Sequence, residues 1–437
     1  MKGESGNVRG LLDALVESAE ALLTASREKF EALEAMDTNR IEALSEAERT
    51  YATKLVRGRL ALRNLLVQQS DNEVMEAAGY TAMLCDEAKA IRGVNDNSVS
   101  NTYRAIRNFS LNPEHALAMM DGTPLNNTLT DAYSYMSVVD PELYPSFKSF
   151  SFWHHIYEWD DTGDRQYLVG FKEKEMLRRN FGSIGRRVLK SDVFPHMKEP
   201  LVQRIRVDLA PQHRKLYKKI IRERIAELPE DESVLDIETQ QKLRQVCGQA
   251  VVNPSAFSAT AMTSEVVVRC DGLLDELGVY PGSESGEKVI LFAHFRSTIE
   301  YLKERYKDFN PGVIYGGNPR RSEASRLKFL QDPSCKVLIA NPLSGGVGLN
   351  FQSVCRYVIF VEPTSVPGDF KQASERVYRS GQKLLVSIYL LEARGTASVE
   401  AVDNMLRKEG DAVFVYRDET SLLTSLLGDS APVRRAA

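Results

Sequence analysis

Two arginines and a glutamine near the end of the chain have a spacing that could bind a phosphate group. Gln372, Arg376 and Arg379 recur at i, i+4 and i+7, so a helix over residues 369–380 would carry all three on one face. The guanidinium fork meets phosphate oxygens bidentately. Shortly before them lies the glycine-rich run Ser344-Gly-Gly-Val-Gly-Leu-Asn350, whose bare N–H groups could also bind an anion. The pattern indicates an anion-binding arrangement.

Short apolar runs predict the elements that would position this arrangement. The helix has a second, apolar face made of Phe370, Ala373 and Val377, which predicts packing on a sheet. Strand, loop, strand, helix, strand is the order of a parallel sheet with crossover helices. Strands are predicted over 288–292, 313–315, 336–340, 356–361 and 384–391, with helices over 297–307 and 319–330.

A carboxylate pair follows an earlier apolar run. Tyr80-Thr-Ala-Met-Leu-Cys85 predicts a strand, and Asp86 and Glu87 come directly after it. This is where α/β enzymes hold Mg²⁺ and a water, although an acidic pair after a strand is also typical of a helix start. Residues 116–120 predict another strand, which ends in Asp121-Gly-Thr-Pro124, a sequence that also suits a plain turn.

Basic residues concentrate in residues 171–224, which hold 16 Lys or Arg and 6 Asp or Glu, for a net charge of about +10. Because the whole chain has a net charge of −4, this local excess is a candidate footprint for a nucleic-acid backbone, although such runs are usually solvated faces. Seven aromatic residues between 125 and 161 are predicted to be core: Tyr133, Tyr135, Phe147, Phe150, Phe152, Trp153 and Trp159.

Composition places the chain among ordinary globular proteins. Its 437 residues are 43% hydrophobic and 27% charged, enough for two or three domains. The five cysteines are scattered without a CxxC pair, which favours a reducing compartment, the cytoplasm or the nucleus of a eukaryote. No apolar run approaches the roughly 20 residues of a membrane span. Residues 1–75 read as helical throughout, and residues 396–427 as two amphipathic helices.

Taken in order, these segments resemble the Swi/Snf-type family of ATP-dependent DNA translocases, within the superfamily-two helicases. The resemblance runs from about Tyr80 to the C-terminus and rests on several motifs. Each of the following segments is similar to a motif of that family: Asp86-Glu-Ala-Lys89 (the DEAH-like box), residues 121–127 (TGTPxxN), 186–190 and 207–212 (the linker into the second lobe), 243–247 (LRxxC), 289–295 (the fourth motif), 344–350 (the fifth) and 372–382 (the sixth).

The resemblance implies two RecA-like lobes with ATP in the cleft between them, in an α/β fold. It places a helical segment at 1–75, a partial first lobe with a helical insertion at 76–200, and a complete second lobe with a helical insertion at 201–395. Residues 396–437 would form a C-terminal helical brace.

It also implies roles for residues. Asp86 would hold Mg²⁺ through water, and Glu87 would orient or deprotonate the attacking water. Arg376 and Arg379 would be arginine fingers on the γ-phosphate, with Gln372 holding the arginine face in place. The backbone of Gly345, Gly346 and Gly348 would lie near nucleotide or DNA phosphates. Gly122 and Thr123 would couple the nucleotide to DNA. DNA contacts are assigned to Thr123, Arg186, Arg187, Lys215, Lys218, Lys219 and Arg222.

The chain departs from the family at the phosphate site. No GxxxxGK[ST] loop occurs in the sequence, Lys89 stands where the family has histidine, and Asp121 stands where it has Thr or Ser. The predicted function is a DNA-dependent ATPase acting on duplex DNA, with ATP and Mg²⁺ bound once a second polypeptide supplies the Walker A half. The alternative is a catalytically inactive DNA-binding or partner-docking module. A third possibility, a nuclease or other hydrolase, is not supported by any group of His and Asp residues that could bind a metal ion.

Overall fold

The structure, a computed structural model, describes residues 82–94, 99–159, 166–194, 197–226, 237–316, 318–343 and 349–416, together with Glu17 and Ala21. The chain divides into two compact units, Met1–Asp121 with Ser137–Pro141 and Gly122–Met136 with Glu142–Ala437. The predicted helices over 1–75, apart from Glu17 and Ala21, and the glycines of 344–348 lie outside the described residues.

The first unit contains a parallel strand pair joined by a helix. β1 (Ala82–Asp86) pairs in parallel with β2 (Ala116–Met120), which confirms the two strands predicted there. The connection contains η1 (Ala88–Ile91) and α4 (Asn101–Ser110). The Ser100 side chain accepts a hydrogen bond from the Tyr103 N–H and caps α4. Among the described residues of this unit, the sheet has two strands.

The second unit is built on a six-stranded sheet whose pairings are all parallel. The strand order is β5-β10-β9-β6-β8-β7. This confirms the predicted α/β fold with a parallel sheet. Four of the six strands also coincide to within one or two residues with predicted apolar runs. The strands are β5 (Leu201–Val207), β6 (Val289–Phe292), β7 (Gly312–Ile314), β8 (Val337–Ala340), β9 (Tyr357–Phe360) and β10 (Ser387–Ala393).

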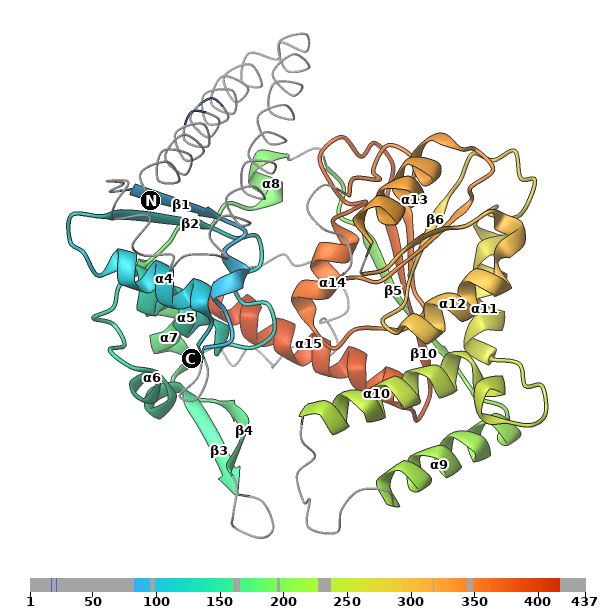
Figure 1. The fold of residues 1–437 in the computed structure, drawn as a ribbon, viewed down its shortest axis with the longest axis horizontal. Helices are drawn as coiled ribbons and strands as arrows, with labels where there is room; N and C mark the ends of the chain where they lie inside the picture. Colours follow the sequence, from blue (N-terminus) through green and yellow to red (C-terminus); the bar gives the residue numbers. More distant parts are fainter. Residues whose placement is uncertain are drawn as a thin grey trace, which may run out of the picture. The chain divides into compact units, whose positions relative to one another are not determined.

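Both faces of this sheet are buried. Alternate residues enter different core clusters, with Val289 and Leu291 in one and Ile290 and Phe292 in the other. Figure 1 shows α11 and α12 on one side and α13 and α14 on the other. In the described ranges, the helices after α4 are α5 (Asp131–Val139), α6 (Phe147–His154), α7 (Lys174–Ser183), α8 (Lys190–Val193), α9 (Pro211–Ala226), α10 (Ile237–Val252), η2 (Pro254–Phe257), α11 (Glu265–Glu276), α12 (Arg296–Arg305), η3 (Lys307–Phe309), α13 (Pro319–Gln331), α14 (Pro367–Ser374) and α15 (Ala397–Tyr416).

Two predicted helices have different bounds in the structure. The helix predicted over 369–380 is α14, which begins at Pro367 and ends at Ser374. Of the tail predicted as two helices over 396–427, residues 397–416 form one helix, α15, and residues 417–427 lie outside the described residues. No helix in the described ranges is long and apolar enough to cross a membrane.

An antiparallel hairpin stands where only helices and core aromatics were predicted. β3 (His155–Trp159) pairs with β4 (Gln166–Phe171). Tyr133, Tyr135 and Phe150 are buried as predicted. The prediction is wrong for Phe152, Trp153 and Trp159, which are 69%, 47% and 58% exposed. Within the described residues, no second layer covers this two-stranded ribbon, so its side chains are exposed, and periodicity alone does not reveal that.

Candidate functional site

The two candidate finger arginines lie in a series of turns beyond α14 rather than on its surface. The expectation that Gln372, Arg376 and Arg379 share one helical face is therefore wrong, because only Gln372 is on the helix. Beyond the end of α14 at Ser374, the Arg376 carbonyl accepts a hydrogen bond from the Phe351 N–H at 2.9 Å. Arg376 is half-buried and Arg379 is exposed. The Arg379 Nη1 donates to Asn350 Oδ1 at 2.7 Å. The segment similar to the fifth motif (344–350) and the segment similar to the sixth (372–382) are thus in direct contact.

The TGTPxxN-like segment docks on α14. The Gly368 N–H donates to the Asn126 carbonyl at 2.9 Å. A Cβ added at Gly368 would lie 1.8 Å from Asn126 Oδ1 and 3.1 Å from Asn126 Cα, so this close approach needs glycine. The Gln372 Nε2 donates to Thr123 Oγ1 at 3.5 Å. Thr123 is buried and Gln372 half-buried. The structure brings these two predicted residues together, and the DNA contact assigned to Thr123 stays a prediction.

Helix α15 supports the same segment from a second side. The Lys408 Nζ donates to Asn127 Oδ1 at 2.7 Å and to the Ser365 carbonyl at 3.2 Å. Burial lowers the pKa of Lys408, and Arg244 and Arg407 lower it further. The Tyr416 hydroxyl accepts a hydrogen bond from the Leu125 N–H at 2.6 Å. The segment is therefore held between α14 and α15.

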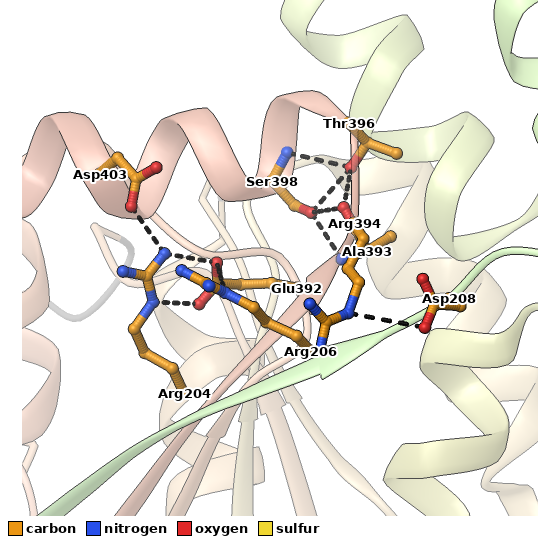
Figure 2. A network of polar contacts seen from close by, with 9 residues as sticks. All are labelled: Arg204, Arg206, Asp208, Glu392, Ala393, Arg394, Thr396, Ser398 and Asp403. Carbon is orange, nitrogen blue, oxygen red and sulfur yellow. Dashed lines mark hydrogen bonds and ion pairs between the residues drawn. The ribbon is translucent and has the colours of Figure 1, made fainter.

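The first turns of α15 are fixed by the charge network in Figure 2. Glu392 is fully buried, and Arg204 donates to its two carboxylate oxygens at 2.5 and 2.6 Å. The same guanidinium reaches Asp403 on α15 at 2.7 Å. The hydrogen bond to Glu392 raises the pKa of Arg204. The Thr396 hydroxyl donates to the Ala393 carbonyl and accepts from the Ser398 N–H. This network links β5, β10 and α15.

A second buried carboxylate orders the C-terminal edge of the sheet. The Glu362 carboxylate, just after β9, accepts hydrogen bonds from the backbone N–H groups of His294 and Phe295 and from the Thr298 hydroxyl. Burial raises the pKa of Glu362 although these hydrogen bonds oppose the rise. Burial also lowers the pKa of His294 to about 4. The edge at which α/β sheets bind ligands is thus held rigidly here.

The acidic pair occupies the end of β1, as predicted. Asp86 is the last residue of the strand, and Glu87 follows with a φ of 48°. Both side chains are exposed, and the Asp86 Oδ1 accepts a hydrogen bond from the Glu87 N–H at 2.9 Å. Among the described residues, no group of three or more His, Cys, Asp or Glu side chains could hold a metal ion. The pair fits a Mg²⁺ held largely through water and phosphate oxygens rather than by a protein cage.

Asp121 stands where the family has Thr or Ser. Its side chain is only 6% exposed and forms an ion pair with Arg92, whose Nη2 lies 2.9 Å from Asp121 Oδ2. The charge of Asp121 therefore has a counterion within its own unit.

The predicted basic face is a solvent-exposed stripe of α9. Lys215, Lys218, Lys219 and Arg222 are all exposed and recur at i, i+3, i+4 and i+7. Lys219 lies 3.5 Å from Glu223, one turn further along the helix. Elsewhere, Arg186 and Arg187 are both exposed, and the guanidinium of Arg187 lies 4.1 Å from the centre of the Tyr416 ring. Arg187 thus contributes a packing contact of its own.

Sequence reasoning missed Asn126, Gly368 and Lys408 as site residues. The one available signal was the glycine at position 368, directly before the helix predicted over 369–380. Nothing local in the sequence marks Lys408, because its partner Asn127 is 281 residues away.

Comparisons with known proteins match these elements. Residues 42–251 match the SNF2-related domain family, and residues 269–381 match the helicase conserved C-terminal domain family. An uncharacterized ATP-dependent helicase of Mycoplasma pneumoniae is 25% identical over 88% of this chain and 35% of its own length. The CHD3-type chromatin-remodeling factor CHR7 of Arabidopsis thaliana is 26% identical over 74% of this chain and 26% of its own length.

The mouse DNA repair and recombination protein RAD54-like is 24% identical over 79% of this chain and 49% of its own length. The chain therefore spans between about a quarter and a half of these three relatives. Among solved structures, the Sulfolobus solfataricus SWI2/SNF2 ATPase core in complex with dsDNA is 20% identical over 80% of this chain and 71% of its own length, with a TM-score of 0.38.

Proposed function

This chain belongs to the Swi/Snf-type family of ATP-dependent helicases, and on that premise we propose that it forms part of a DNA-dependent ATPase that translocates on duplex DNA. No GxxxxGK[ST] run occurs in these 437 residues, so the Walker A half of the nucleotide site would have to be supplied from outside them. Its compartment would be the cytoplasm, or the nucleus in a eukaryotic host.

The observation that carries this proposal is the docking of the TGTPxxN-like segment on the helix that leads to the two arginines. Asn126 and Thr123 contact Gly368 and Gln372, while Arg379 is held by Asn350. A remnant with a purely structural role has no need for both arginines beside such a contact. The arrangement supports a retained link between DNA-contacting and nucleotide-contacting segments.

In the proposed reaction, water attacks the γ-phosphate and ADP leaves. Glu87 would accept the proton of that water, and Asp86 would hold Mg²⁺ through water. Bound Mg²⁺ would neutralise charge on the β- and γ-phosphate oxygens. Arg376 and Arg379 would donate hydrogen bonds to the oxygens on which charge accumulates, a task suited to the guanidinium fork.

The first experiment measures ATP turnover with and without duplex DNA. We expect the purified chain to hydrolyse ATP at the background rate, since arginine fingers act only on nucleotide that is already held in line. Adding a polypeptide with a Walker A lobe should restore turnover, and Arg379→Ala should lower the restored rate by about 10³-fold or more. Arg326→Ala is the matched control, because Arg326 pairs with Glu323 on α13. DNA-stimulated turnover by the chain alone that disappears in Glu87→Gln would refute the need for a second polypeptide.

DNA binding is assigned to the exposed stripe of α9. Each neutralised phosphate contributes a slope of roughly −0.9 to the plot of log affinity against log salt. Replacing Lys215, Lys218, Lys219 and Arg222 by alanine should therefore flatten the slope for a duplex by up to about 3.6. An unchanged slope would identify the stripe as an ordinary solvated face.

The second candidate is a catalytically inactive DNA-binding or partner-docking module. It is favoured by the absence of a phosphate loop from the sequence and by the Arg92–Asp121 ion pair, which suits a structural role for the Asp121 position. Salt-dependent duplex binding with no turnover, even after a Walker A lobe is added, would select this candidate.

A further inference from the structure

Each of the two candidate finger arginines follows a residue that Lys190 contacts. Lys190 is the first residue of α8, and its Nζ lies 2.6 Å from Glu375 Oε1 in an ion pair. The same ammonium group donates a hydrogen bond to the Tyr378 carbonyl at 3.3 Å and lies 4.9 Å from the centre of the Tyr378 ring. Glu375 directly precedes Arg376, and Tyr378 directly precedes Arg379. We name residues 375–379 the arginine turn.

The arginine turn has little regular secondary structure to fix it. The helix before it, α14, ends at Ser374. The Arg379 N–H donates at 3.1 Å to the Val377 carbonyl, only two residues earlier. The longer-range backbone bond is the one from the Phe351 N–H to the Arg376 carbonyl, at 2.9 Å. The position of the arginine turn therefore depends on contacts with other segments.

The segment that carries Lys190 has a fixed base of its own. The Phe194 N–H donates to the Lys190 carbonyl at 2.7 Å. Met197 packs against the core cluster that contains Tyr378. β5 then begins at Leu201 and pairs with β10 in the sheet. Lys190 therefore reaches the arginine turn from an anchored segment.

The exposure of the ion pair separates positioning from global stability. The side chains of Lys190 and Glu375 are 37% and 40% exposed. Ion pairs with this much solvent around them contribute little to the folding of a domain. The Tyr378 ring, by contrast, is buried. Replacing Lys190 should therefore loosen the arginine turn without unfolding the protein around it.

We propose that Lys190 is a positioning residue, which keeps the arginine turn in one conformation so that the guanidinium groups of Arg376 and Arg379 are preorganised for a phosphate group. The catalytic consequence rests on the proposed function, whereas the positioning is a property of the chain alone. Preorganised donors stabilise a transition state because they need no rearrangement during the reaction. Loss of Lys190 should therefore lower kcat and leave KM for ATP unchanged.

Amide hydrogen exchange of the purified chain tests the positioning without nucleotide. In Lys190→Ala, the Phe351 N–H should exchange about three- to tenfold faster, because an exposed ion pair and a cation–π contact together are lost. Lys190→Arg keeps the charge and both kinds of contact, so it should preserve the original rate. Lys307→Ala is the matched control, because it removes a lysine from another exposed pair, with Glu304 at 2.9 Å, and should not affect Phe351.

A sheet reporter and a reversed ion pair complete this experiment. The Val289 N–H, bonded to the Lys336 carbonyl at 3.0 Å, should keep its exchange rate in Lys190→Ala. Lys190→Glu places two carboxylates together and should speed exchange at Phe351 further, and adding Glu375→Lys should recover part of the loss. Unchanged exchange at Phe351 in Lys190→Ala, equal acceleration at Val289, or no recovery in the reversed pair would overturn the proposal.

Turnover in the presence of a Walker A lobe tests the catalytic consequence. Lys190→Ala should lower kcat about three- to tenfold with KM for ATP unchanged, and Lys190→Arg should restore kcat. Faster exchange at Phe351 with an unchanged kcat would overturn the role of Lys190 in catalysis. Absence of turnover by the original chain would instead refute the proposed function, and the exchange rates would still decide whether Lys190 positions the arginine turn.

Discussion

A methyl group at position 368 should undo the docking of the TGTPxxN-like segment. In Gly368→Ala, the new Cβ would meet Asn126 Oδ1 at 1.8 Å and Cγ at 2.5 Å, and the Asn126 side chain must rotate away. Rotation leaves the contact with Asn126 Cα at 3.1 Å, which belongs to the backbone and yields less easily. Overpacking of this kind costs about 1–3 kcal/mol, and we expect the lower half of that range because part of the clash is relieved.

Amide hydrogen exchange measures this loss locally. The Leu125 N–H, bonded to the Tyr416 hydroxyl, and the residue 368 N–H, bonded to the Asn126 carbonyl, report on the docked state. A cost of 1–2 kcal/mol should speed their exchange about 5- to 30-fold, provided that they exchange through undocking.

Two further variants make the experiment decisive. Gly410→Ala is the matched control, because a Cβ there meets nothing within 4 Å and the site is inside α15. Alanine should stabilise that helix by up to about 1 kcal/mol. Combining Gly368→Ala with Asn126→Ala removes the two closest contacts and should recover part of the loss, with a coupling of about 1 kcal/mol. Unchanged exchange in Gly368→Ala, or no recovery in the double variant, would refute the steric explanation.

Two other predictions concern stability. Glu392→Gln should lower the free energy of unfolding by about 3–5 kcal/mol in urea denaturation, because Arg204 loses a buried partner. Glu323→Gln, in an exposed pair, is the control and should change the free energy of unfolding by less than about 1 kcal/mol. Equal losses of stability in the two variants would contradict the prediction. Burial and the neighbouring His154 lower the pKa of His155 to about 4, below its usual 6.5, so the fold favours the neutral ring. Stability should therefore fall as pH drops from about 6.5 to about 4, by about 2 kcal/mol at pH 5, and His155→Gln should reduce this dependence in the same assay; an unaltered dependence would count against it.

The sheet could be predicted because its strands are short apolar runs between turn signals. β6 and β8 are buried on both faces, so every residue is apolar and the run itself predicts the strand. The burial of three apolar residues in the predicted helix was predicted for the same reason, since Phe370 and Ala373 on α14 and Val377 in the turns beyond it are all fully buried. These features depend on local composition, which a sequence displays directly.

The end of α14 and the exposed aromatics could not be predicted because both depend on distant segments. In the turns beyond α14, the Phe351 N–H donates a hydrogen bond to the Arg376 carbonyl. Residues 369–380 alone do not reveal this contact. Trp153 and Trp159 are as apolar as any core residue, yet no element of the described part of the chain covers them, so they are exposed. For the same reason, the docking of Asn126 on Gly368 could not be predicted from either segment alone.

The pairing of β5 with β10 has a consequence for how the chain folds. Leu201 pairs with Ser387, and these residues are 186 positions apart in the sequence. β5 therefore leaves the ribosome long before β10, its one neighbour in the sheet within the described residues, exists. Until β10 is made, the backbone of β5 has no strand to pair with, and Arg204 on β5 lacks its partner Glu392. This edge of the sheet therefore forms late in folding. A nascent chain stopped before residue 387 would hold β6, β7, β8 and β9 yet keep β5 unpaired, which makes that strand the point where a folding helper would be needed.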